Sequence, residues 1–440
     1  MRLITLSSIC IALLLFSRVA GQTPTVKLIP IAQGWARNQN NTVIFRRNSI
    51  VSRKDHQYVA FYDPEGKVIL AKRKLGSVSW EIKTTQYTGD VADAHKSISI
   101  AIDGAGFLHM VWNQHNSTLQ YCRSLHPESL ELSPQLPMLS RLESSVTYPE
   151  FYNLPGGDLI FLYRDGSSGK GNLVMNRYSV KTARWIRLQD NLIDGENQRS
   201  AYWQTTVGGD GTIHLSWVWR ETADVATNHD VCYAKSLDGG KTWEKSSGAR
   251  YHLPITARSA EYVTRIPESS DLINQTSMTT DVLGRPYIAT YWKTVGENTP
   301  QYRLIFHDGK KWRISQVSHR KSQFSLQGLG TRRIPISRPL VLTYLLEGKV
   351  AVLMVFRDAE RSDRVSLSIR KNDDTEGWVT QDLTITSVGM WEPTYDPNVW
   401  EKKKSLHLFV QTVGQGQAEG LADLPSQMVN VLEWNPKVIH

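Results

Sequence analysis

Residues 202–220 read YWQTTVGGDGTIHLSWVWR, an alternating strand, a Gly/Asp turn at Asp210 and a second strand rich in aromatic residues. Alternation with a period of two, interrupted by glycine and aspartate, is typical of a β-hairpin. The same pattern recurs six more times, in residues 47–63, 95–112, 148–164, 274–292, 337–357 and 391–410. Further short strands such as LQYCRS, NLVMNRYSV and DVCYAKS follow the copies, which gives about four strands per unit.

The spacing of these copies predicts the architecture. They begin roughly 58 residues apart, and a repeat of this length with four strands is typical of a β-propeller blade. We therefore predict an all-β fold, a seven-bladed β-propeller forming a single domain over residues 22–440. The segment 236–243, SLDGGKTW, matches the Asp-box, a turn between outer strands of a blade. The alternative, two packed β-sandwiches, would need a linker that the sequence lacks.

Both ends of the chain carry further signals. Residues 1–21 combine a short basic start, an apolar core and a final Val-Ala-Gly, the pattern of a secretory signal peptide cleaved before Gln22. This predicts a secreted or periplasmic protein. The apolar core is too short to span a bilayer, so no membrane span is expected. The first strand of the mature chain and the C-terminal MVNVLEW, residues 428–434, should help to close the ring.

The cysteines left after cleavage are Cys122 and Cys232. They fall in the third strands of blades two and four, which are not neighbours. A disulfide needs Cα atoms within about 7 Å, so we expect two free thiols.

The net charge and the aromatic content of the chain indicate what kind of molecule it binds. The chain has a formal net charge of +9 with no long basic run, and it contains 14 Trp and 17 Tyr. A basic protein rich in flat, amphipathic rings suits an acidic polysaccharide or oligosaccharide more than nucleic acid. We expect the protein to be a monomer.

One face of the predicted ring concentrates reactive side chains. The start of the first strand of a blade and the end of its second strand lie on the same face, because the two strands are antiparallel. These positions include His95, His115, Tyr148 and Arg164 on adjacent blades, and Tyr202, Arg220, Asn274 and Arg338 farther around the ring. Few acids are expected there, Glu392 being the main one, and the Gly/Asp turns of the opposite face carry no comparable set. Loops near 125–140, 185–198 and 412–428 should shape the cleft.

This set of side chains favours one kind of chemistry. Glycoside hydrolysis usually needs two carboxylates beside the bond, and no Ser nucleophile or metal motif is evident. His, Tyr and Arg together suit β-elimination of a uronic acid: a cation binds the carboxylate, a base removes the C5 proton, and an acid protonates the leaving O4.

Several segments carry a family resemblance: DAHKSISIAIDGAGFLHMVWNQH from residue 93, TYPEF from 147, WVWRET from 217 and NHDVCYAKSLDGGKTW from 228. The chain resembles the BNR-repeat propellers that include ulvan lyases and L-rhamnose-α-1,4-D-glucuronate lyases. In those lyases two histidines lie about 20 residues apart and an Arg follows a Tyr by 16. His95 and His115 here are 20 apart, and Tyr148 and Arg164 are 16 apart.

The resemblance implies a polysaccharide lyase that cleaves rhamnosyl-glucuronate linkages in ulvan or an arabinogalactan. It implies that Arg164 and His95 neutralise the substrate carboxylate and that Tyr148 and His115 share the roles of acid and base. Tyr202, Arg220, Asn274 and Arg338 would bind the substrate. No cofactor is expected to be required for catalysis. Some relatives hold a structural zinc or calcium ion, and His229 and Cys232 are the one near pair of possible ligands in this sequence.

Two other functions stay open. A propeller glycoside hydrolase, for example a rhamnosidase, would yield saturated products. A non-catalytic carbohydrate-binding propeller would keep the aromatic and basic face but tolerate loss of His115 or Tyr148. A sialidase is disfavoured because the histidine pair would have no role in it.

Overall fold

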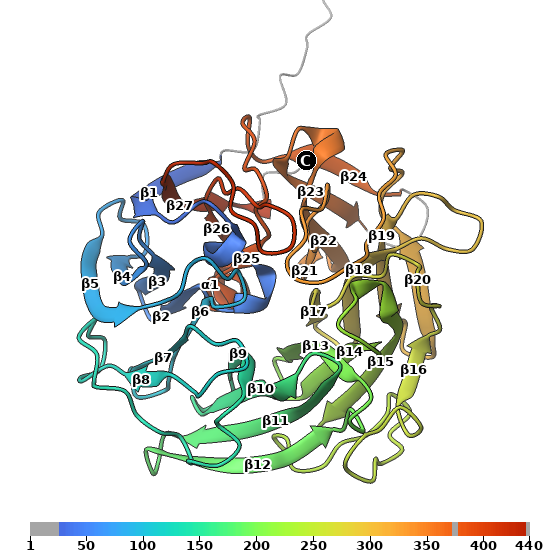
Figure 1. Ribbon diagram of the computed structural model, residues 1–440, viewed down its shortest axis with the longest axis horizontal. Coiled ribbons are helices and arrows are strands. Elements are labelled where there is room, and N and C mark those ends of the chain that lie inside the picture. Colours follow the sequence, from blue (N-terminus) through green and yellow to red (C-terminus); the bar gives the residue numbers. More distant parts are fainter. Residues whose placement is uncertain (1–25, 372–376, 437–440) are drawn as a thin grey trace, which may run out of the picture.

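The strands surround a central axis in the computed structural model, which describes residues 26–371 and 377–436 (Figure 1). Hydrogen bonds group the strands of these ranges into six sheets, because blades three and four join in one eight-stranded sheet through a single parallel pairing of Gly171 with Ser200. Within each blade neighbouring strands are antiparallel, and the first strand lies nearest the axis. The chain forms a seven-bladed β-propeller, as the repeats predict. No helix in these ranges is long and apolar enough to cross a membrane. The predicted signal peptide, residues 1–21, lies outside the described residues.

The first three blades follow the chain in order. Blade one contains β2 (Ile50–Arg53), β3 (His56–Tyr62), β4 (Lys67–Lys74) and β5 (Glu81–Thr88). Blade two contains β6 (Ile98–Ile102), β7 (Leu108–Trp112) and β8 (Tyr121–Arg123). Blade three contains β9 (Val146–Asn153), β10 (Leu159–Ser167), β11 (Lys170–Ser179) and β12 (Arg184–Ile193). Residues 185–193 thus form a strand, so the loop expected there is wrong.

The remaining blades continue around the ring. Blade four contains β13 (Ser200–Val207), β14 (Ile213–Arg220), β15 (Asn228–Ser236) and β16 (Glu261–Thr264). Blade five contains β17 (Ser277–Thr280), β18 (Pro286–Trp292), β19 (Gln301–His307) and β20 (Trp312–Gln316). Blade six contains β21 (Leu340–Leu346), β22 (Lys349–Asp358), β23 (Arg364–Lys371) and β24 (Val379–Asp382).

Blade seven joins the two ends of the chain. Its order is β25 (Thr394–Tyr395), β26 (Leu406–Val410), β27 (Gln427–Trp434) and then β1 (Lys27–Gly34). The N-terminal strand β1 runs antiparallel to the C-terminal strand β27, pairing Lys27 with Glu433 and Gly34 with Gln427. Both ends of the chain thus contribute strands to one sheet, as the sequence predicts.

The turns between first and second strands explain the repeated Gly/Asp signal. In blade four the Asp210 carboxylate accepts hydrogen bonds from the amide and the hydroxyl of Thr212, at 2.9 and 2.8 Å. Gly211 has a φ of 86°, which a residue with a β-carbon rarely adopts. Asp103 and Asp281 bind backbone amides in the matching turns of blades two and five. The aspartates are therefore structural.

Blade seven departs from this scheme. The repeat pattern of residues 391–410 predicts a turn between two strands, but the connection from β25 to β26 is the short helix α1 (Pro397–Lys403). The Asp396 side chain accepts the amides of Asn398 and Val399, and proline occupies the first turn. An Asp-Pro pair starts a helix well, because the carboxylate binds free amides and proline has none to leave unbonded.

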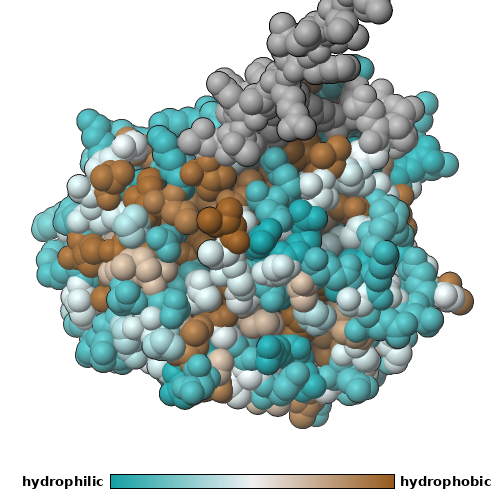
Figure 2. Space-filling view, turned by 90° about the horizontal axis from the view of Figure 1, so that it is seen from above, coloured by the Kyte–Doolittle hydropathy of each residue, from teal (hydrophilic) through white to brown (hydrophobic). Residues whose placement is uncertain are grey.

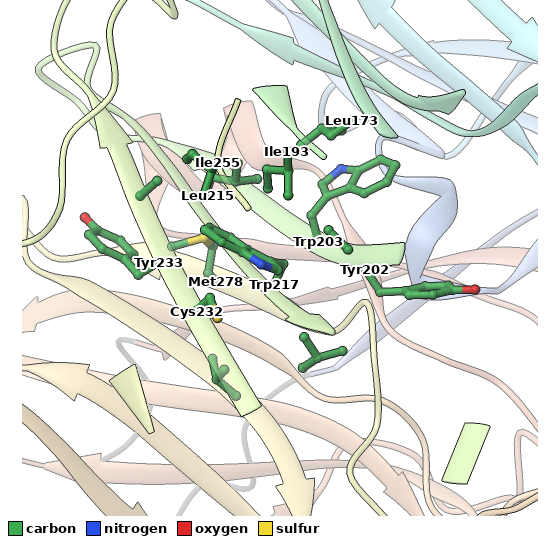
Figure 3. Packing of buried hydrophobic residues seen from close by; sticks show 14 of the residues in the cluster. Leu173, Ile193, Tyr202, Trp203, Leu215, Trp217, Cys232, Tyr233, Ile255 and Met278 are labelled. Carbon is green, nitrogen blue, oxygen red and sulfur yellow. The ribbon is translucent and has the colours of Figure 1, made fainter. Parts of the chain in front are cut away.

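The hydrophobic core lies between neighbouring blades. Figure 3 shows Trp203 and Trp217 of blade four packed near Leu173 of blade three and Met278 of blade five. Tyr202 lies at the edge of this cluster, with its hydroxyl directed away from it. Cys122 in β8 and Cys232 in β15 are both buried and free, as predicted. In the side view of Figure 2, hydrophilic residues dominate the surface, with hydrophobic groups among them.

Candidate active site

The four predicted catalytic side chains meet on one face of blades two and three. His95 precedes β6, His115 follows β7, and Tyr148 and Arg164 lie in β9 and β10. The rings of His95 and His115 stack with centroids 4.3 Å apart, and the ring of Tyr148 is 5.9 Å from that of His95. The Arg164 guanidinium carbon lies 5.2 Å from the Tyr148 ring.

A β-bulge directs Tyr148 to this place. Leu162 pairs with Glu150 and Arg164 pairs with Thr147, so two residues of β9 face one residue of β10. Tyr148 is one of these two and has a φ of 54°. A tyrosine in the left-handed region is strained by about 1–3 kcal/mol, and such strain concentrates at functional sites. The hydroxyl of Tyr148 has no hydrogen-bond partner among the described residues, and the side chain borders a cavity.

The histidine pair is organised by Asp93. One carboxylate oxygen of Asp93 is 3.0 Å from Nδ1 of His95, and the other is 2.6 Å from Nδ1 of His115. Because both rings direct Nδ1 toward Asp93, their Nε2 edges face away from it. Burial alone would raise the pKa of Asp93, but the hydrogen bonds from His115 and His95 hold that pKa well below its usual value.

A second carboxylate, Glu419, also reaches His95. Its Oε1 lies 3.3 Å from Nδ1 of His95. Burial alone would lower the pKa of His95, but the hydrogen bonds to Asp93 and Glu419 outweigh burial and raise the pKa to about 9. His95 is therefore an imidazolium at neutral pH. The expectation of few acids on this face is wrong, because Asp93 and Glu419 lie in loops between strands.

Tyr202 lies between two arginines. Its hydroxyl accepts hydrogen bonds from Arg164 at 3.3 Å and Arg220 at 3.2 Å, and lies 2.7 Å from the Ser168 hydroxyl. Burial alone would raise the pKa of Tyr202, but the charges of Arg220 and Arg164 outweigh it and lower the pKa to about 8.

The arginines of this face differ in their partners. Arg338 forms an ion pair with Glu392 at 3.0 Å, so its charge is balanced. Within the described ranges Arg164 and Arg220 have no carboxylate partner and bind phenol, amide, hydroxyl and backbone oxygens instead, Asn274 being one partner of Arg220 at 3.1 Å. The face therefore carries uncompensated positive charge that suits an acidic ligand.

A small cavity opens between these side chains. It encloses about 40 Å³ and is lined by His95, Tyr148, Arg220, Asn274 and Arg338 among others. Arg164 is only 2% exposed and does not line it, because the tyrosine rings stand in front. The structure thus brings all eight predicted site residues to one face, and five of them line this cavity, whereas His115, Tyr202 and Arg164 do not.

A roof segment, defined here as residues 324–336 between β20 and β21, covers the cavity. Leu326, Gly330 and Thr331 line it from this side. The Leu326 amide donates to Asp271 at 2.7 Å, and the Gly328 amide donates to Asp224 at 2.7 Å. No sequence pattern indicates this segment, because its apolar and basic residues show no strand or helix period.

A larger cavity of about 570 Å³ lies along the central channel toward the Gly/Asp turns. Threonine, serine, asparagine and tyrosine side chains dominate its lining, which includes Thr205, Ser277 and Tyr395 but no histidine. The opposite face therefore has a cavity that the sequence did not indicate, but it lacks the His/Tyr/Arg combination.

Metal ligands are sparse over residues 26–371 and 377–436. Asp93, His95 and His115 form the one cluster with spacing suited to a metal ion, and both Nδ1 atoms already contact Asp93. His229 instead bonds Glu221 at 2.9 Å and contacts Asp230 at 3.1 Å. The predicted absence of a catalytic metal stays a prediction.

The sequence places the chain in a family. Residues 56–320 match the family model described as BNR repeat-containing family member. This match covers more than half of the chain, so the protein belongs to that BNR repeat family. No curated protein matches the chain in sequence.

Solved structures share the backbone over most of its length. Polysaccharide lyase Uly1 is 14% identical, with a TM-score of 0.68 over 93% of this chain and 99% of that one. An ulvan lyase of family PL25 is 14% identical, with a TM-score of 0.67 over 91% and 95%. A PL25 ulvan lyase bound to –[GlcA(1-4)Rha3S]– has a TM-score of 0.62 at 14% identity, over 91% and 92%. The chain therefore resembles ulvan lyases in structure, and identity this low shows the fold alone.

Proposed function

We propose that the protein is an exported polysaccharide lyase that cleaves L-rhamnosyl-α-1,4-D-glucuronate linkages by β-elimination. The observation that carries this proposal is the cationic His95 stacked on His115 beside the unbonded Tyr148 hydroxyl, in a face with unpaired arginines. The fold shared with ulvan lyases, one of them bound to a glucuronate–rhamnose repeat, supports the choice of substrate.

The first step is neutralisation of the uronate. The carboxylate of the glucuronate binds at the His95 imidazolium, and Arg220 at the cavity wall adds a second positive charge. Arg164 contributes from behind the Tyr148 ring. A neutralised carboxylate makes the neighbouring C5–H bond more acidic, because the negative charge that develops on proton removal is stabilised.

The second step is the elimination itself. His115, oriented by Asp93, takes the C5 proton at its Nε2 atom. Burial and the neighbouring Tyr202 raise the pKa of Tyr148, so its phenol holds its proton at neutral pH and donates it to O4 of the leaving rhamnose. The C5–H electron pair becomes the C4–C5 double bond, and the C4–O4 pair leaves with the rhamnose. Solvent then returns the proton from His115 to Tyr148.

The carboxylates of the site argue against the glycosidase alternative. Asp93 holds two histidines, Glu419 contacts His95 and two backbone amides, and Glu392 is paired with Arg338. Hydrolysis needs one carboxyl group as acid and another as base or nucleophile on either side of the bond. None of these three groups is free for such a role.

The deciding experiment follows ultraviolet absorbance while the purified protein acts on ulvan and, separately, on gum arabic. β-Elimination creates a conjugated C4–C5 double bond that absorbs, whereas hydrolysis does not. A rise on either polymer supports a lyase and identifies its substrate. Free rhamnose without absorbance would establish the hydrolase, and binding without any product would establish the carbohydrate-binding module.

A further inference from the structure

Glu419 reaches the site from a loop far away in sequence. The segment between β26 and β27, drawn in red in Figure 1, forms a tight turn in which the Gly416 amide donates to the Gly420 carbonyl at 2.8 Å. Ala418 and Glu419 both have positive φ, 49° and 67°. Two successive non-glycine residues in the left-handed region are strained, and this strain is held where the turn presents the Glu419 side chain.

The Glu419 carboxylate joins three segments of the chain. Its Oε1 lies near Nδ1 of His95 and also accepts the Thr331 amide of the roof segment. Its Oε2 accepts the Ala94 amide at 3.3 Å. The carboxylate thus fixes the position of His95 relative to the roof and to the β26–β27 loop.

The charges around His95 show why Asp93 alone does not supply enough negative charge for the histidine pair. Asp93 is shared by two imidazoles, because each of its oxygens contacts a different histidine. The other groups around His95 supply no negative charge at neutral pH: Phe45 stacks on the ring at 5.8 Å, Tyr148 is a phenol, and Arg338, 5.7 Å from the Phe45 ring, is a cation. Glu419 therefore supplies the second negative charge for the histidine pair.

We propose that Glu419 is a positioning residue that holds the His95 side chain in place and in its imidazolium form. It does not touch the reacting atoms. The part of this inference that concerns ionisation stands on the geometry alone, whereas its effect on catalysis rests on the proposed lyase function. Burial alone would raise the pKa of Glu419, but its contacts with His95 lower that pKa to about 2, which agrees with a permanently ionised partner.

The test measures the ionisation of His95 directly. Imidazole signals of the full mature chain, labelled at histidine and assigned with His95→Gln, are followed by NMR across pH. We expect Glu419→Gln to lower the His95 midpoint by about one pH unit or more, because an opposite charge within hydrogen-bonding distance shifts a pKa by about 1–3 units. The matched control is Asp423→Asn, which removes an exposed carboxylate from the same loop and should leave the midpoint unchanged.

Two results would overturn the inference: an unchanged midpoint in Glu419→Gln, or an equal fall in the control. If Glu419→Gln does not fold, Glu419→Asp replaces it, because the shorter side chain keeps the charge in the loop but withdraws it from Nδ1. A smaller fall is then expected, and no fall contradicts the proposal.

Kinetics provide the second readout. If the protein is a lyase, the wild-type rate declines as pH rises through the His95 pKa, because only the cation neutralises the carboxylate. Glu419→Gln should move this decline to lower pH and recover most of the wild-type rate in more acidic buffer. A protein inactive on every polymer would contradict the proposed function, yet the NMR titration would still decide the role of Glu419.

Discussion

At the residue scale, the hydroxyl of Tyr148 is a group whose removal should affect the proposed chemistry but not the stability of the fold. The ring of Tyr148 contacts Phe45 at 5.0 Å and Tyr202 at 5.9 Å, so it contributes to packing. Its hydroxyl has no hydrogen bond within residues 26–371 and 377–436. A change that removes only this atom therefore tests the proposed acid without disturbing the core.

We expect Tyr148→Phe to reduce the rate of double-bond formation by about 10²–10⁴, the usual contribution of a general acid. Its melting temperature should stay close to that of the wild type. The measurements are initial absorbance rates and thermal unfolding. Tyr344→Phe is the control, because Tyr344 is also a buried tyrosine with an unpartnered hydroxyl, but it lies in blade six. Equal rates in Tyr148→Phe and wild type would exclude Tyr148 as the acid.

Tyr202 offers a spectroscopic signal from the same site. Because Arg220 and Arg164 lower its pKa to about 8, it should ionise before ordinary tyrosines, which do so near pH 10. The tyrosinate difference spectrum should show a step of one residue at about pH 8 that is missing in Tyr202→Phe. A group with a lowered folded pKa adds stability at high pH, so unfolding free energy should rise relative to Tyr202→Phe between pH 8 and 10. A first step near pH 10 in both proteins would contradict this prediction.

The sequence predicts the site in part. His95, His115, Tyr148 and Arg164 could be found because they occupy equivalent ends of consecutive strands, and strand register follows from alternation. Asp93 lies two residues before His95 in a loop, and nothing in the repeat distinguishes it from a turn aspartate. No feature of the sequence indicates Glu419, because the β26–β27 loop lies beside His95 only in the folded chain.

At the element scale, the connections between strands differ more than the strands. In turns that match the repeat, an aspartate carboxylate accepts hydrogen bonds from backbone amides of the same turn, as at Asp103 and Asp210. Helix α1 replaces such a turn in blade seven, where β25 has only two residues. Alternation predicts a strand, but a helix of seven residues is too short to show a helical period in the sequence.

Asp396 ties this helix to the neighbouring blade. It is fully buried and accepts hydrogen bonds from Ser52 at 3.0 Å and Gln57 at 2.8 Å in blade one, as well as capping α1. We expect Asp396→Ala to lower the free energy of unfolding by about 3 kcal/mol, because a helix cap is lost and buried donors lose their acceptor. The measurement is chemical denaturation.

The control for this change is Glu401→Ala on the same helix. The Glu401 side chain is 67% exposed and pairs only with Lys404, so its loss should change stability by less than about 0.5 kcal/mol. Similar stabilities for Asp396→Ala and Glu401→Ala would show that the contact between blades one and seven contributes little.

At the scale of the whole molecule, ring geometry determines the state of the cysteines. Cys122 and Cys232 lie in blades two and four, both are buried, and burial raises the pKa of both thiols. We expect no reaction with a thiol reagent in the native protein and two equivalents after unfolding in denaturant. Fast labelling of the native mature chain would contradict the packing between these blades.

The sheet of blade seven takes its outer strand from the opposite end of the chain. β1 covers the outer edge of β27, and Ile31 and Ala32 pack against the cluster that contains Val429 and Val431. A mature chain that begins at Trp35 would leave this edge and these side chains open. We expect it to aggregate and to lose cooperative unfolding, because an exposed apolar edge strand pairs with other chains.

Size-exclusion chromatography and thermal unfolding would compare it with a chain that begins at Gln22. If the shortened chain is monomeric and unfolds at the same temperature, the remaining blade contacts alone hold the ring closed, and β1 only covers an edge that is already stable.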